Sequence, residues 1–158
     1  MARKVEEVVA IIREAFSGVE RPKKEDLLHF PDKSDDMWIE SFLDDTETDW
    51  VDIDPKKIEY ECEALTAFSP AAWRYYLPAY MTWHLRNYAT SGSLTVDNVI
   101  YALDFVRHPN TIRFVALSKE QGKAVLAFLE FMSEVSDEQV DSKVARHAID
   151  AYWNKFEE

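Results

Sequence analysis

Glycine is scarce in this chain: only three of its 158 residues are glycine, Gly18, Gly92 and Gly122. Glycine makes up about 7% of an average protein. Its scarcity disfavours a tight-turned β-sandwich and favours helices joined by short loops. The glycine spacings of the P-loop and of the dinucleotide-binding fingerprint are both absent, which excludes those phosphate cradles.

Cysteine is represented by Cys62 alone. One cysteine excludes an internal disulfide framework and a cysteine-based zinc site, and it suits a reducing compartment. The sequence also has no signal peptide and no apolar run of membrane-spanning length. We therefore expect a soluble cytoplasmic protein that makes no membrane contact.

Positive charge is in short supply, because 18 Lys and Arg residues face 30 Asp and Glu residues, for a net charge of −12. Residues 32–63, the acidic segment, hold thirteen acidic side chains and three lysines, a net charge of −10. Such a surface repels the phosphates of nucleic acids and anionic lipids. If charge selects a partner, we expect a basic protein or a cation, and no nucleic acid.

What the chain does have is apolar periodicity. Apolar residues make up 47% of the chain and aromatic residues 13%, so residues 1–158 can form one domain with a sizeable core. We predict an all-α fold of six or seven helices with at most one short extended segment, at 112–117. Helical spacing and capping signals place the helices at 5–16, from Ser34, from Pro55 to Leu65, at 70–88, at 95–108, at 119–135 and from Ser136 onward.

The helix predicted at 70–88 organises the fold. Ser69 is a suitable N-cap, and Pro70 suits the first helical position. Its apolar face is wide enough to contact neighbours on several sides. Pro78 lies inside the helix, where it should kink the axis and free the carbonyl of Arg74.

Two interpretations of this helix remain open. A ligand pocket at the Pro78 kink would use side chains from one helical stretch: Trp73, Arg74, Tyr76, Tyr80 and His84. Tyr80 and Tyr88 flank His84 by one turn on each side, so its imidazole could hold a ligand or move a proton. The same spacing is typical of a packed core, with His84 bonded to a tyrosine hydroxyl or to the freed carbonyl. We favour the core interpretation.

The densest acidic run provides the other candidate surface, formed by Asp44, Asp45, Glu47, Asp49, Asp52 and Asp54. Alternating carboxylates can bind a hard cation, but the central glycine of a calcium loop is missing and Lys56 replaces its last acidic ligand. We therefore predict no metal site, and favour a solvated loop or a docking surface.

Recognisable catalytic sets are lacking as well. The histidines show no metal-ligand spacing, no serine lies in a nucleophile elbow, and Cys62 has no basic neighbour in sequence. The catalytic residues, if any, stay unknown; we predict no cofactor and favour a protein that is not an enzyme.

Three stretches resemble a family of uncharacterised bacterial proteins, domain of unknown function 6714. The first is FSPAAWRYYLPAYM at 68–81, where members typically read FLTPEAFRYYLPAYL. The others are IREAFSGV at 12–19 and RFVALSKEQ at 113–121, in the family's order. Ser69 replaces the usual Thr, which keeps the cap, and Ala71 replaces the usual Glu. The resemblance implies a small, mainly helical bacterial domain and brings no activity, cofactor or catalytic residue.

The first functional hypothesis is a non-catalytic interaction protein whose acidic segment 32–63 binds a basic protein partner. The alternative is a small-ligand-binding or enzymatic domain with its aromatic pocket at the Pro78 kink. Self-association through exposed aromatic side chains is a third possibility. The oligomeric state stays open.

Overall fold

The computed structural model describes residues 3–28, 49–106, 111–135 and 140–158. Helices dominate these residues, and no strand forms among them; an isolated antiparallel bridge joins Leu28 to Phe68. The prediction of an all-α fold is confirmed. In the part of the chain described, no helix has the length and apolar character needed to cross a membrane.

The elements follow one another in a simple order. The α-helices described are α1 (Val5–Ala15), α3 (Pro55–Tyr60), α4 (Ala64–Ala67), α5 (Pro70–Asn87), α6 (Thr95–Tyr101), α7 (Thr111–Val115), α8 (Lys119–Glu134) and α9 (Ser142–Ala151). Short 3₁₀ turns are η1 (Lys24–Asp26), η3 (Trp50–Asp52) and η4 (Trp153–Phe156).

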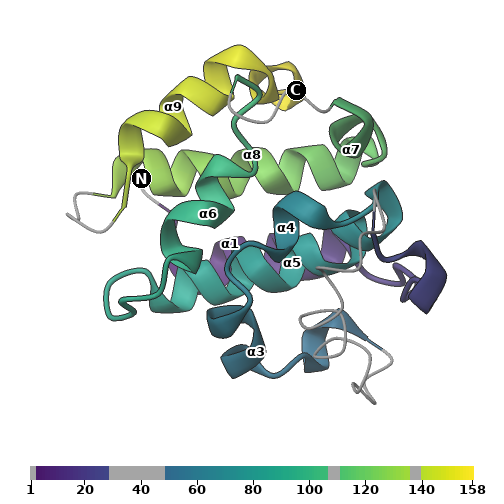
Figure 1. Cartoon of the computed structure of the whole chain (residues 1–158). Helices are drawn as coiled ribbons and strands as arrows, with labels where there is room; N and C mark the ends of the chain where they lie inside the picture. The colour runs from purple at the N-terminus through teal and green to yellow at the C-terminus, as the bar shows by residue number, and fades with distance from the viewer. Residues whose placement is uncertain (1–2, 29–48, 107–110, 136–139) are drawn as a thin grey trace.

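Helix α5 lies in the middle of this arrangement (Figure 1). Helix α8 runs above it in the view, α9 covers α8, and α3 lies on the opposite side of α5. Helix α1 packs against both α5 and α8, while η3, α3, α4, α6 and α7 also contact α5. Neighbours on several sides explain why α5 carries a wide apolar surface.

The start of α5 agrees with the sequence prediction. The hydroxyl of Ser69 accepts a hydrogen bond from the amide of Ala72 at 3.2 Å, and Pro70 occupies the first helical position. The same hydroxyl donates to the carbonyl of Asp26, which joins the η1 region to α5. The helix continues through Pro78 to Asn87, and twelve of its 18 residues are buried. Burial on this scale makes α5 the centre of the core.

Two predicted helices end differently in the structure. The stretch from Pro55 to Leu65 forms two short helices, α3 and α4, separated by the turn at 61–63. The helix predicted at 95–108 ends at Tyr101. One distant and one local hydrogen bond form beyond this end. The indole of Trp153 donates to the carbonyl of Leu103 at 2.8 Å, and the Asp104 carboxylate accepts from the amide of Val106 two residues on. These bonds replace those of a longer helix.

The extended segment predicted at 112–117 is wrong, because residues 111–115 form helix α7. Arg113 is buried there, and its guanidinium donates to the carbonyls of Phe68 and Thr66 at 2.9 and 2.8 Å. Ile112 and Val115 are exposed instead. At these three positions, burial is the reverse of what hydrophobicity alone indicates, whereas Phe114 between them is buried as expected.

The C-terminal helices also have clear capping signals. Ser118 and Gln121 form the predicted capping box at the start of α8. Helix α9 begins at Ser142, where the carboxylate of Asp141 accepts from the amide of Val144 at 3.2 Å. The predicted helix starts at Ser34 and Ser136 lie outside the described residues.

Candidate functional site

The predicted aromatic residues of α5 lie in the core. Trp73, Tyr76 and Tyr80 are at most 1% exposed. Tyr76 stacks on Phe68 with ring centroids 4.7 Å apart, and the Tyr80 hydroxyl donates to the carbonyl of Glu61 at 2.7 Å. Burial is the main cause that raises the pKa of Tyr80 well above its usual value. These contacts are those of a packed interior.

His84 is fully buried beside them, but within the described residues it lacks the hydrogen bond that the core interpretation expected. Its ring stacks on Tyr88 and meets Phe128 edge to face, with centroids 6.2 and 5.4 Å away. Neither ring nitrogen has a hydrogen-bond partner among the described residues. Burial lowers the pKa of His84 from 6.5 to about 3, so the imidazole is neutral at physiological pH.

Arg74 is separated from these rings. Its Nε donates to the side-chain oxygen of Gln121 on α8 at 3.0 Å, and the same oxygen accepts from the amide of Ser118. Arg74 also lines a hollow between the start of α5 and residues 18–26. The five predicted ligand-binding residues therefore do not converge on one space, and ligand binding by them stays a prediction.

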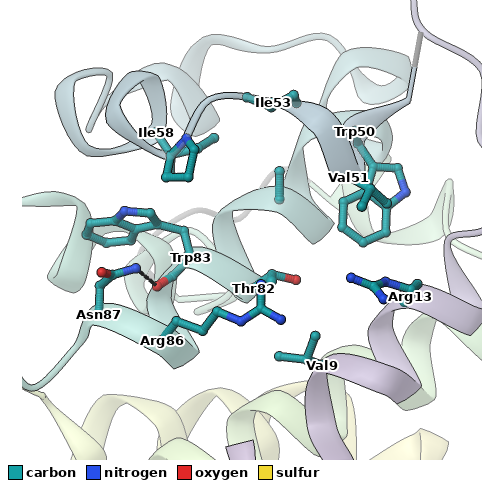
Figure 2. A pocket seen from close by; sticks show the side chains of 12 residues that line it. Val9, Arg13, Trp50, Val51, Ile53, Ile58, Thr82, Trp83, Arg86 and Asn87 are labelled. Carbon is teal, nitrogen blue, oxygen red and sulfur yellow. Dashed lines mark hydrogen bonds between the residues drawn. The ribbon is translucent and has the colours of Figure 1, made fainter. Parts of the chain in front are cut away.

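A cavity of about 100 Å³ lies on another side of α5, between this helix, α1 and the η3–α3 region (Figure 2). None of Trp73, Arg74, Tyr76, Tyr80 and His84 lines it. Its walls are mostly apolar side chains, with arginines at the exposed edge: Val9, Arg13, Trp50, Val51, Ile53, Pro55, Ile58, Ala79, Thr82, Trp83, Arg86 and Asn87.

Local structure holds the walls of this cavity in place. The Trp50 indole donates to the carbonyl of Phe16 at 3.1 Å, which fixes η3 to the end of α1. Asp54 caps α3 by accepting from the amide of Lys56 at 2.9 Å, and this helix presents Ile58 to the cavity. The Asn87 amide donates to the carbonyl of Trp83 at 2.8 Å within α5.

Three polar side chains meet at one end of the cavity. Figure 2 shows the guanidinium groups of Arg13 and Arg86 pointing toward one another, with the hydroxyl of Thr82 directed into the same space. The Thr82 hydroxyl is buried and has no hydrogen-bond partner among the described residues. A buried hydroxyl without a partner is costly, and a polar group that met it after a rotation of the Thr82 side chain would relieve that cost.

Glu6 partly neutralises this end of the cavity. Its two carboxylate oxygens accept from Nε and Nη2 of Arg86, each at 3.1 Å. The hydrogen bond with Arg86 is the main cause that lowers the pKa of Glu6, and the charge of Arg13 contributes to the same shift. Both side chains of the pair are exposed, so the contact is weak and exchangeable with solvent.

Arg13 has no ion-pair or hydrogen-bond partner within the described part of the chain. It also lines a neighbouring hollow with Asp49 and Asp52, but neither carboxylate lies within salt-bridge distance of it. Arg13 is therefore a cation at the cavity edge that is available to an anion.

The predicted acidic surface is described only in part, because Asp44, Asp45 and Glu47 lie outside the described residues. Asp49 accepts from the amide of Val51 at 3.1 Å and caps η3, so it shares with Asp54 a role in local structure. Asp52 is exposed. Among the residues described, no group of three or more His, Cys, Asp or Glu side chains could hold a metal ion.

The sequence prediction missed the cavity, although one signal for it exists. Ala79, Thr82 and Arg86 recur at helical spacing on the side of α5 away from the aromatic face. A small residue, a hydroxyl and a guanidinium in one row indicate a functional surface as well as a solvated one. Arg13 and Trp50 carry no such signal, because only the tertiary structure brings them to this row.

Comparison with known proteins supports the family resemblance. A family described as "Family of unknown function (DUF6714)" matches residues 4–157, nearly the whole chain. No curated protein and no solved structure matches the chain. The chain therefore belongs to the family of unknown function DUF6714.

Proposed function

We propose that this protein binds a small molecule in the cavity between α1, the η3–α3 region and α5, without transforming it. The observation that supports this most is the pairing of an apolar cavity with a buried hydroxyl, that of Thr82, which has no partner in the described residues. Ligand sites are commonly apolar hollows with a few converging polar groups. The proposal keeps the ligand-binding alternative and moves the site to another side of α5.

The chemistry of the lining favours binding over catalysis. Among the described residues that line the cavity there is no histidine, cysteine, lysine or carboxylate. The Thr82 hydroxyl therefore has no general base beside it, and an unassisted hydroxyl is a weak nucleophile. Arginines hold and orient ligands but do not exchange protons at neutral pH.

A filling substitution tests the proposal. Ala79 is buried at the cavity wall, so Ala79→Leu would place a branched side chain in the space that the ligand needs. Ala71→Leu is the matched control, because Ala71 is exposed on the same helix and does not line this cavity. A fragment library would be screened against the wild type and both variants by ligand-observed NMR and thermal shift.

We expect fragments that bind the wild type and Ala71→Leu but fail to bind Ala79→Leu. Fragments that bind all three proteins alike would contradict the proposal, since they would occupy another place. So would the absence of any fragment that binds the wild type. Thermal unfolding of both variants would show whether Ala79→Leu is folded.

The acidic segment supports a second candidate, the docking of a basic protein by a cytoplasmic interaction protein. Its carboxylates at Asp52 and Glu63 are exposed, and within the described residues they form no ion pair and accept no capping hydrogen bond. Their charge can therefore act on a partner at low ionic strength. A bound partner would be lost on Asp52→Lys with Glu63→Lys, and a partner indifferent to this reversal would contradict the idea.

A further inference from the structure

We infer that the ligand of the cavity is a short monocarboxylate, whose carboxylate binds between Arg13, Arg86 and the Thr82 hydroxyl. This inference rests on the proposed function, and it names the chemical class that the site selects. Its tail would lie against the apolar walls of the cavity, away from the arginines.

Donors suited to a carboxylate remain available at this place. Arg86 uses Nε and Nη2 for Glu6, which leaves its Nη1 without an acceptor among the described residues. Arg13 and the Thr82 hydroxyl have no partner there either. Two guanidinium groups from different helices and a hydroxyl can satisfy two planar carboxylate oxygens with charge-assisted hydrogen bonds.

The balance of charge indicates a monoanion. Arg13 and Arg86 bring two positive charges, and Glu6 returns one negative charge. At most one positive charge remains, because Asp49 and Asp52 in the neighbouring hollow add no positive charge, and one carboxylate is enough to neutralise it. A phosphate monoester, with nearly two negative charges at neutral pH, would exceed this balance and would also meet a protein of net charge −12.

The size of the cavity limits the tail. An apolar cavity of roughly 150 Å³ accommodates benzene, and this one measures about 100 Å³. The side chains behind the arginines are almost fully buried, among them Val9 at 3% and Ile58 at 2% exposure. A short aliphatic tail fits this space, whereas a long fatty chain does not.

The contact between Arg86 and Glu6 gives an internal precedent for the proposed recognition. Arg86 already holds a carboxylate through two parallel hydrogen bonds of equal length. The ligand would approach from the cavity side of the same guanidinium, so Glu6 would stay bound on its outer side. Because the charge of Arg86 is already paired with Glu6, most of the electrostatic attraction for the ligand carboxylate would come from Arg13.

The experiment compares acids with neutral molecules of the same shape. Butanoate and pentanoate would be titrated against butanamide and pentanamide, using isothermal calorimetry and amide chemical shifts of the labelled full chain. The proteins would be the wild type, Arg13→Gln, Arg13→Lys, Thr82→Val and Arg3→Gln. Arg3→Gln is the control, because Arg3 forms an exposed pair with Glu130 at 3.2 Å and does not line this cavity.

We expect the wild type and Arg3→Gln to bind the acids at least about tenfold more tightly than the amides, as expected for a charge-assisted contact. Arg13→Gln should lose this preference and keep its amide binding, and Arg13→Lys should recover part of it. Thr82→Val should weaken acid binding by a smaller factor, because it removes one neutral donor.

The outcomes separate this inference from the proposed function. Equal binding of acids and amides, or unchanged acid binding by Arg13→Gln, would overturn the carboxylate assignment while leaving a small-molecule site. Binding of neither class would overturn the carboxylate assignment, and the fragment screen on Ala79→Leu would then decide the wider proposal on its own. A folded control such as Arg13→Lys keeps the test decisive if Arg13→Gln is unstable.

Discussion

His84 and Phe128 meet edge to face across the space between α5 and α8, with ring centroids 5.4 Å apart. The edge of one ring approaches the face of the other, a favoured aromatic arrangement. Both residues are fully buried, and neither imidazole nitrogen has a partner in the described residues. The imidazole of His84 is thus held in the core by ring packing and not by hydrogen bonds to the described residues. This has consequences for stability at low and at neutral pH.

The first prediction concerns pH. Burial lowers the pKa of His84 from 6.5 to about 3 in the folded state. Between these values the unfolded chain binds a proton that the folded chain does not, so the free energy of unfolding falls as pH falls from 6.5 toward 3. Because one pKa unit corresponds to about 1.36 kcal/mol, His84 alone should remove about 2 kcal/mol between pH 6.5 and 5.

Urea unfolding from pH 7.5 to 5 would measure this effect in the wild type and in His84→Leu. Subtracting the two curves isolates the contribution of His84 from that of the carboxylates. The difference should be constant above pH 7 and grow steadily below pH 6.5. Parallel curves over the whole range would contradict the assigned shift in pKa.

The second prediction concerns stability at neutral pH. His84→Leu replaces a buried polar ring by an apolar side chain, which removes two nitrogens without partners. Each such group costs about 1–3 kcal/mol, and imperfect repacking should offset part of the gain, so we expect a net stabilisation of about 1 kcal/mol. His84→Asn keeps a buried polar group in a smaller side chain and should destabilise. Chemical denaturation at pH 7.5 would measure both, and a Leu variant less stable than the wild type would contradict the argument.

The parts of the fold that could be predicted from sequence are those with local causes. Ser69 and Ser118 lie within three residues of the amides that they cap, so both helix starts can be read directly. The end of α6 could not, because the Leu103 carbonyl is held by Trp153, fifty residues away. The helical state of 111–115 likewise depends on carbonyls of residues 66 and 68.

The same distinction applies to the candidate site. The aromatic row of α5 is strong in the sequence, but aromatic side chains at helical spacing serve a core as well as a pocket, and here they pack as core. The cavity takes its polar end from α1 and α5, so Arg13 and Thr82 meet only in the folded chain. The spacing of Thr82 and Arg86 on one helix can be read from the sequence, whereas the approach of Arg13 to them depends on the tertiary structure.

The third prediction concerns the buried Arg113. Its guanidinium binds two backbone carbonyls at the junction of α4 and α5, those of Thr66 and Phe68. Arg113→Met would keep the apolar stem and leave both carbonyls without this donor, so we expect a loss of about 2–3 kcal/mol in the free energy of unfolding. Arg146→Met is the control, because Arg146 is exposed and donates one bond to the carbonyl of Ser133. Equal losses in the free energy of unfolding in the two variants would contradict the prediction, because the buried hydrogen bonds of Arg113 would then stabilise no more than the exposed one of Arg146.

The fourth prediction concerns Gly122, inside α8. A Cβ at this position would lie 2.4–2.6 Å from ring atoms of Phe156, so Gly122→Ala would force the ring away from its contacts with Tyr152 and Trp153. Glycine to alanine inside a helix usually stabilises by about 1 kcal/mol. Here overpacking should outweigh this gain and give a net destabilisation of about 1 kcal/mol.

A double variant separates the two effects on Gly122. Phe156→Leu removes the ring, so Gly122→Ala introduced in that background should show the ordinary helix gain and raise the melting temperature. Gly92→Ala is the control, because a Cβ there meets nothing within 4 Å. If Gly122→Ala stabilises the wild type as much as it stabilises Phe156→Leu, the ring moves aside freely. The C-terminal turn would then owe its position chiefly to Trp153, whose buried indole donates to the carbonyl of Leu103 after α6.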